Sequence, residues 1–194
     1  MMRYITQRLK RWVATGVVCL ALGATTECFA ATLYVATNGN DTAHDCWTNA
    51  FTNMQAALDA ARPGDTVYVA GHTFNITNTQ LSWTGVASSV TIRGGYEATN
   101  TVDMPGMRDS TRWSSIIRAN GAIRVLLASS VTNGVLEEVT FTGGALSMAS
   151  GNGRGAGLYA SNCEGLVIAR CTIVSNSTTD TSAAYGGGIY QGGG

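Results

Sequence analysis

LLASSVTNGVLEEVTF, residues 126–141, recurs further along the chain as LYASNCEGLVIARCTI, residues 158–173. The two copies align without a gap, so that most apolar positions meet apolar positions and Phe141 falls on Ile173. A third copy begins with GIY at residues 188–190. A short repeat of nearly constant length is typical of proteins that stack small structural units in a row.

Each copy of the repeat consists of short β-branched runs separated by turn residues. Cys171–Val174 is such a run, and it is flanked by Gly, Asn and Ser. Helical repeats of this length need two amphipathic helices per unit, whereas these runs are typical of strands and turns. The Gly-Gly-x-Gly-x-Asp pattern of calcium-binding β-rolls does not occur. We therefore predict an all-β architecture in which positions one repeat apart, such as Phe141 and Ile173, lie above one another.

The region before the repeat contains strand-like runs and one predicted helix. Leu33–Ala36 and Thr66–Val69 have the composition of strands. Between them, Thr52 and Gln55 fit a capping box at the start of an amphipathic helix over residues 51–61. An open end of stacked strands exposes unpaired backbone and bare core, so we expect this helix to cover that end. Further strand-like runs lie at Ser89–Arg93 and Ser115–Arg118.

The segment 1–30 has the three-part layout of a secretory signal. Residues 1–11 carry four cations and no acid, residues 12–22 are apolar, and small residues stand at Cys28 and Ala30. The apolar run is about a dozen residues, shorter than the roughly 20 that cross a bilayer. We therefore expect an exported protein cleaved after Ala30, without an integral membrane span. The predicted organisation is a signal peptide at 1–30, a cap with the first coils at 31–118, and truncated repeat coils at 119–194.

Several short motifs carry a resemblance to known proteins. They are Leu33–Val35 with Asn38–Asp41, Pro63–Val69, Ile92–Tyr96, Val139–Gly144 and Gly186–Tyr190. Together they resemble bacterial right-handed parallel β-helix proteins with the pectin-lyase-like fold, and polymorphic outer-membrane and autotransporter-type surface proteins. The resemblance implies a right-handed parallel β-helix with an N-terminal amphipathic capping helix. Because that fold hosts lyases, hydrolases, epimerases, adhesins and passive stalks, function has to be argued from a site.

The charge and the cysteines of the chain limit its partners. After residue 30, eight arginines and no lysine face eleven carboxylates, which leaves a net charge of −3. Binding of nucleic acid or of anionic lipid needs a basic surface, so neither is expected. Cys46, Cys163 and Cys171 show no CxxC spacing and the chain has two histidines, so we predict no metal site and no cofactor. The three thiols allow one disulfide with a free thiol, or three buried thiols.

Two residue pairs that the repeat brings together are candidate binding residues. Arg170 aligns with Glu138 one coil away, which forms either a stacked surface ion pair or a charged binding or catalytic patch. Tyr159 aligns with Tyr190, and the two rings form either a stabilising ladder or a platform for sugar rings. No motif of a known nucleophile stands out, so the catalytic residues, if the protein has any, stay unassigned.

The predicted function is that of a secreted or cell-surface protein with an adhesin or passenger-type structural or binding role. The export signal, the glycine-rich coils and the lack of a convergent polar site favour it. Its partner would be an extracellular polysaccharide or another molecule on a host or cell surface. The alternative is a polysaccharide-active enzyme, a lyase, hydrolase or epimerase, whose active site lies on coils beyond residue 194. That alternative rests on fold analogy alone.

Overall fold

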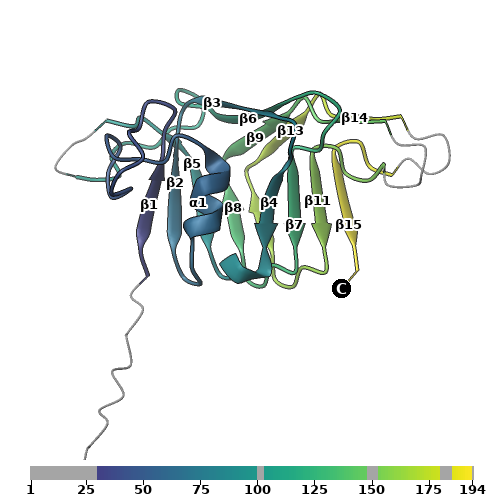
Figure 1. Ribbon diagram of the computed structural model, residues 1–194, viewed down its shortest axis with the longest axis horizontal. Coiled ribbons are helices and arrows are strands. Elements are labelled where there is room, and N and C mark those ends of the chain that lie inside the picture. Colours follow the sequence, from purple (N-terminus) through teal and green to yellow (C-terminus); the bar gives the residue numbers. More distant parts are fainter. Residues whose placement is uncertain (1–29, 100–102, 148–152, 180–184, 194) are drawn as a thin grey trace, which may run out of the picture.

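Every pair of named strands in the computed structural model is parallel, and within a sheet the strands succeed one another along the long axis, as β4, β7, β11 and β15 do in Figure 1. The structure describes residues 30–99, 103–147, 153–179 and 185–193. Apart from Ala30, the predicted signal peptide lies outside the described residues. The described chain is mainly β, with parallel sheets and one α-helix.

Three parallel sheets contain almost all of the strands. The first sheet has the order β1 (Thr32–Val35), β2 (Thr66–Ala70), β5 (Thr91–Tyr96), β8 (Val135–Glu137) and β12 (Val167–Ala169). The second has the order β3 (Thr73–Thr77), β6 (Ser115–Asn120), β9 (Val139–Thr142) and β13 (Thr172–Val174). The third has the order β4 (Leu81–Thr84), β7 (Leu126–Ser129), β11 (Leu158–Ser161) and β15 (Ile189–Gly192). A small fourth sheet pairs β10 (Ala145–Leu146) with β14 (Ser177–Thr178).

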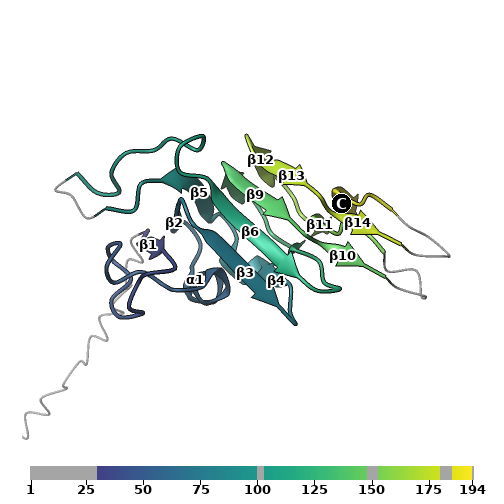
Figure 2. The same ribbon diagram turned by 90° about the horizontal axis from the view of Figure 1, so that it is seen from above.

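The chain visits the three sheets in turn. From β2 onward, each pass adds one strand to the first sheet, then one to the second and then one to the third. Viewed from above, β3, β6, β9 and β13 of the second sheet lie side by side (Figure 2). Strands that are neighbours in a sheet are therefore one full pass apart in the sequence.

The register between neighbouring strands follows the sequence repeat. Leu158 pairs with Leu126, and Ile173 pairs with Phe141, so the prediction that positions one repeat apart lie above one another is confirmed. The earlier passes do not keep this spacing. Leu81 pairs with Leu126, which is a longer step along the chain, because this pass contains the long connection between β5 and β6.

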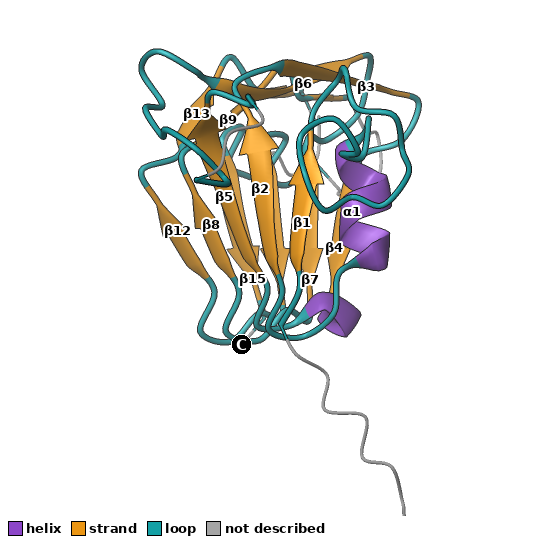
Figure 3. Cartoon of the chain, turned by 90° about the vertical axis from the view of Figure 1, so that its left-hand side faces the viewer, coloured by secondary structure: helices purple, strands orange, loops and turns teal. Residues whose placement is uncertain are grey.

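The predicted helix is present, but its start differs from the prediction. Helix α1 covers Met54–Ala60 and lies beside β4 at the end of the sheets that faces the viewer in Figure 3. Its N-cap is Asn53, whose side chain accepts a hydrogen bond from the Ala56 N–H. The capping box is wrong because both hydrogen-bonding groups of Thr52 are bound elsewhere, to the carboxylate of Asp41 at 2.7 Å each. A short 3-10 helix, η1 (Gly85–Ala87), follows β4.

No helix of the described residues is long and apolar enough to cross a membrane.

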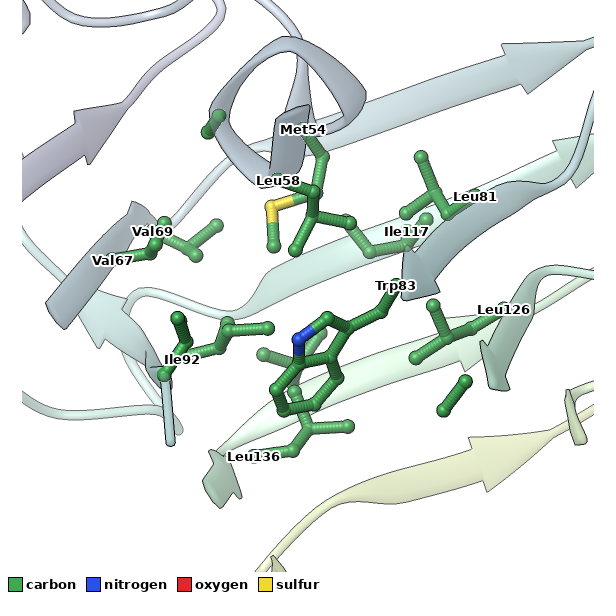
Figure 4. Close-up of a cluster of buried hydrophobic side chains, with 14 of the residues drawn as sticks. Met54, Leu58, Val67, Val69, Leu81, Trp83, Ile92, Ile117, Leu126 and Leu136 are labelled. Atoms are coloured by element: carbon green, nitrogen blue, oxygen red, sulfur yellow. The ribbon is translucent and has the colours of Figure 1, made fainter. Parts of the chain in front are cut away.

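The core lies between the three sheets and receives side chains from each of them and from α1 (Figure 4). Met54 and Leu58 of the helix close one end of this core, where they lie near Leu81 and Ile117. Trp83 is fully buried at its centre, and its indole N–H donates to the Ala87 carbonyl at 2.8 Å. The helix therefore covers apolar surface at the end of the core, beside β4 and β1.

A second, smaller cluster lies apart from this core. It contains the rings of Tyr34, Trp47 and Tyr96, which pack against one another. Trp47 also donates a hydrogen bond from its indole to the Pro105 carbonyl at 3.0 Å, so it joins the loop after β1 to the loop after β5. Both loops are thereby held against the first sheet.

Candidate functional site

The predicted pair Glu138 and Arg170 is part of a larger ion-pair network on the first sheet. Arg170 Nε donates to Glu138 Oε1 at 2.7 Å, and its Nη2 lies 3.4 Å from Glu137 Oε1. Arg108 contacts both carboxylates, at 3.3 Å from Glu137 and 3.2 Å from Glu138. Arg93, which pairs with Glu137 across the strands, places its Nε 3.1 Å from that carboxylate without hydrogen-bond alignment. Two carboxylates thus engage three arginines.

Local backbone geometry explains why these residues meet. Glu138 and Arg170 both stand where the chain leaves the first sheet for the second, and both have left-handed backbone angles, with φ of 55° and 53°. The side chains of Glu138 and Arg170, one pass apart in the chain, therefore point in the same direction. The hydrogen bond from Glu138 raises the pKa of Arg170. Because every arginine of the network already contacts a carboxylate, this arrangement favours the interpretation as a stacked surface network.

The predicted tyrosines lie on another surface, the outward side of the third sheet. Tyr159 pairs with Tyr190 in register, while the preceding Leu158 is fully buried. Strand residues alternate between two sides, so both tyrosines point away from the core. Their ring centroids are 5.4 Å apart, and the exposed Tyr185 adds a third ring 5.8 Å from Tyr190. The prediction that Tyr159 and Tyr190 are neighbours is confirmed.

Two arginines that the sequence did not indicate lie over these rings. The guanidinium of Arg124 is 5.1 Å from the centroid of Tyr159. That of Arg154 is 5.5 Å from Tyr185 and 5.4 Å from Tyr190. These distances fall within the range of cation–π attraction. We call Arg124, Arg154, Tyr159, Tyr185 and Tyr190 together the tyrosine–arginine face.

Neutral oxygens, not carboxylates, hold Arg124 in place. Its Nη1 donates to Gln80 Oε1 at 2.8 Å, its Nη2 to the Arg154 carbonyl at 2.8 Å, and its Nε to the Gly155 carbonyl at 3.0 Å. In the part of the chain that the structure describes, neither Arg124 nor Arg154 forms a salt bridge. Burial lowers the pKa of Arg124, and the buried Nε of Arg154 has no hydrogen-bond partner among those residues.

The two predicted pairs therefore differ in charge balance and do not form one site. Each arginine of the network around Glu138 contacts a carboxylate, whereas Arg124 and Arg154 contact none among the described residues. The tyrosine–arginine face thus carries positive charge although residues 31–194 sum to −3. Partly buried cations gain most from an anionic partner, and flat aromatic faces pack against the C–H face of a sugar ring. The repeat itself could have indicated part of this face, because Arg154 pairs with Tyr185 at the same offset as Tyr159 with Tyr190.

The remaining predictions on chemistry concern metals and thiols. Within the described ranges, no group of three His, Cys, Asp or Glu side chains has the arrangement of a metal site. Cys46, Cys163 and Cys171 are all free, with Cys163 buried and the other two partly buried. The structure therefore contains no disulfide among these three: Cys163 lies between β11 and β12, Cys171 lies between β12 and β13, and each of these two thiols lies near backbone carbonyls.

The chain matches no protein-family model, no curated protein and no solved structure. Its function therefore has to be argued from the tyrosine–arginine face and from the arrangement of the strands.

Proposed function

We propose that this chain belongs to a secreted or cell-surface right-handed parallel β-helix protein of the pectin-lyase-like kind. Three features support this proposal: parallel sheets visited in turn, a nearly constant spacing between the paired strands of the later passes, and a helix over one end of the core. The signal-like layout of segment 1–30 supports export. N-terminal sequencing of the exported protein tests the cleavage site, and we expect it to begin at Ala31.

The proposed role is adhesive rather than catalytic: binding of an acidic extracellular polysaccharide by the tyrosine–arginine face. One observation carries this proposal: two arginines lie over three tyrosine rings. Neither arginine has a carboxylate partner among the described residues. A sugar carboxylate would bind the guanidiniums of Arg124 and Arg154, while the sugar ring packs on Tyr190. Both interactions leave the glycan intact, as adhesion requires.

Calorimetric titration with oligogalacturonate tests this role, with the neutral oligosaccharide of the same length as a second ligand. We expect the acidic ligand to bind and the neutral one to bind much more weakly, with an affinity that falls as salt is added. Arg154→Gln should weaken binding about tenfold, since it removes one charge-assisted contact. Arg170→Gln is the matched control, because it removes the same charge from the ion-pair network on the first sheet.

Equal loss of binding in Arg154→Gln and Arg170→Gln would show that overall charge, not the face, attracts the ligand. Release of shortened or unsaturated oligosaccharides from the polymer by this chain would contradict the non-catalytic role.

A further inference from the structure

The three sheets differ in how their first strands are covered at the end near α1. The outer edge of β1 bonds to the following loop, because Phe51 N–H donates to the Tyr34 carbonyl at 2.8 Å and Tyr34 N–H to the His44 carbonyl at 3.1 Å. The outer edge of β4 bonds to the side chain of Gln55 through both groups of Ser82, at 2.8 and 3.1 Å. Two of the three edges are therefore closed by the chain itself.

The first strand of the second sheet, β3, is different. Among the described residues it pairs only with β6. The Ile116 N–H donates to the His72 carbonyl, so the alternation of a parallel ladder directs the backbone groups of Phe74 and Ile76 towards β6 as well. The N–H and carbonyl groups of Thr73 and Asn75 consequently point to the open edge.

This open edge borders a groove of about 680 Å³. The whole length of β3 forms one side of the groove, and the first turn of α1 with Thr52 forms the other. Met54, Ile76 and Leu81 contribute apolar surface to it. No charged side chain of the described chain lines it. The groove is thus elongated along an unpaired strand and is electrically neutral.

The sequence of β3 gives this edge no protection against pairing. Proteins usually block an exposed edge with charge, proline or a covering element. The strand reads Thr-Phe-Asn-Ile-Thr, which contains neither a charge nor a proline and is rich in residues that favour strands. Because the described residues cover the neighbouring edges of β1 and β4 but not this one, we propose that the groove binds an extended, uncharged polypeptide segment of a partner protein, which joins the second sheet as a strand beside β3.

The lining of the groove defines the chemistry of that segment. Side chains of an added strand alternate between the two sides of the sheet, so every second one would face Met54, Ile76 and Leu81 and should be apolar. The others would lie beside the exposed Asn75 and should be small and polar. A charged side chain would lose water in the groove without gaining an opposite charge, which disfavours acidic and basic segments. This inference rests on main-chain groups of β3, whereas the polysaccharide site rests on the tyrosine–arginine face; Gln80 lines the groove and also accepts from Arg124 Nη1.

Fluorescence anisotropy with the full chain and a labelled peptide tests the proposal. The probe is acetyl-Gly-Thr-Val-Thr-Val-Thr-Gly-amide, which alternates as the groove requires. We expect saturable binding, and about tenfold weaker binding to Asn75→Pro, which removes the outward N–H and leaves the backbone bonds to β6 in place. The side-chain bond from Asn120 to Asn75 is lost in this variant and in its control alike. Asn75→Thr is the matched control, since it changes the same side chain but keeps the N–H, and it should bind within about twofold of the unchanged chain.

A second measurement does not depend on the folding of any variant. The same peptide with N-methyl groups on alternate residues lacks the N–H donors along one of its edges, so it cannot form backbone hydrogen bonds to β3 through that edge. It should bind at least about tenfold more weakly to the unchanged chain. A lysine in place of one valine should also abolish binding.

Equal affinity for the methylated and unmethylated peptides would overturn the proposal, because it would show that main-chain pairing is not used. Absence of peptide binding would overturn it as well. So would self-association of the chain through β3 in place of peptide binding, recognised by its loss in Asn75→Pro.

Discussion

The side-chain amide of Gln55 bonds to both backbone groups of Ser82. Its Nε2 donates to the Ser82 carbonyl at 3.1 Å, and its Oε1 accepts from the Ser82 N–H at 2.8 Å. A strand beside β4 would bond to the same two groups, so one side chain of α1 stands in the place of a strand. Helix α1 therefore covers the core with Met54 and Leu58 and satisfies the edge of the third sheet with Gln55.

Replacing Gln55 with alanine should destabilise the fold. The substitution leaves the N–H and carbonyl of Ser82 without partners at a partly buried position, so we expect the free energy of unfolding to fall by about 1–3 kcal/mol. Urea denaturation followed by circular dichroism measures the change. Asp59→Ala is the control, because Asp59 Oδ1 accepts from the same amide but is not needed for the bonds to Ser82. A Gln55→Ala midpoint equal to that of Asp59→Ala would show that the edge of β4 does not need this cover.

Glycine at position 134 should be required by the packing around Trp83. A Cβ atom there would lie 2.7 Å from the indole carbons of Trp83 and from Val131 Cγ1, and Trp83 is fully buried. We expect Gly134→Ala to lower the free energy of unfolding by about 1–3 kcal/mol, through overpacking. Gly188→Ala is the matched control, since a Cβ at Gly188 would meet only Ile173 at an ordinary 3.7 Å. Equal thermal midpoints of the two variants would contradict this account.

His72 should make the stability depend on pH. Its Nδ1 accepts a hydrogen bond from the Thr37 N–H at 3.2 Å, which requires an unprotonated nitrogen. Burial lowers the pKa of His72 from 6.5, so the unfolded chain takes up a proton more readily than the folded one. The contribution of neutral His72 to the free energy of unfolding is therefore complete above the pKa that His72 has in the unfolded chain. It is lost as the pH falls through the lower pKa that His72 has in the folded chain.

We expect the urea midpoint to fall between about pH 7.5 and pH 5, and to fall less in His72→Gln than in the unchanged chain. Carboxylates that titrate in the same range affect both proteins alike, so the difference between the two curves isolates His72. Parallel curves would show that protonation of His72 does not change the stability of the fold.

The sequence repeat predicted the second half of the described chain well and the first half less well. Phe141 and Ile173 pair as expected because successive passes of equal length through the sheets place like residues side by side. The pairing of Leu81 with Leu126 was not predictable from the period, since the long connection after β5 changes the spacing while the strands still stack. Loop length varies freely on the surface, whereas the register of a buried strand does not.

The candidate site shows the same division. Tyr159 and Tyr190 are adjacent because the repeat places them in register. Arg124 was not predicted, because it reaches Tyr159 from outside the paired strands and is held there by Gln80 and by the carbonyls of the following turn. Thr52 was assigned to a helix cap for a similar reason: only the folded chain brings Asp41 within hydrogen-bonding distance of it.

The sequence by itself determined the strands, their period and the helix near one end, because those features follow from the spacing of apolar and turn residues along the chain. Only the tertiary structure decided which edges are covered, which charges are compensated and where a groove remains. Gln55 closes β4 and loop residues close β1, whereas no other part of the described chain covers the outer edge of β3. Such outcomes depend on contacts between residues far apart in sequence. The free energy of those contacts depends on distances and angles that exist only in the folded chain, so a local sequence pattern does not predict them.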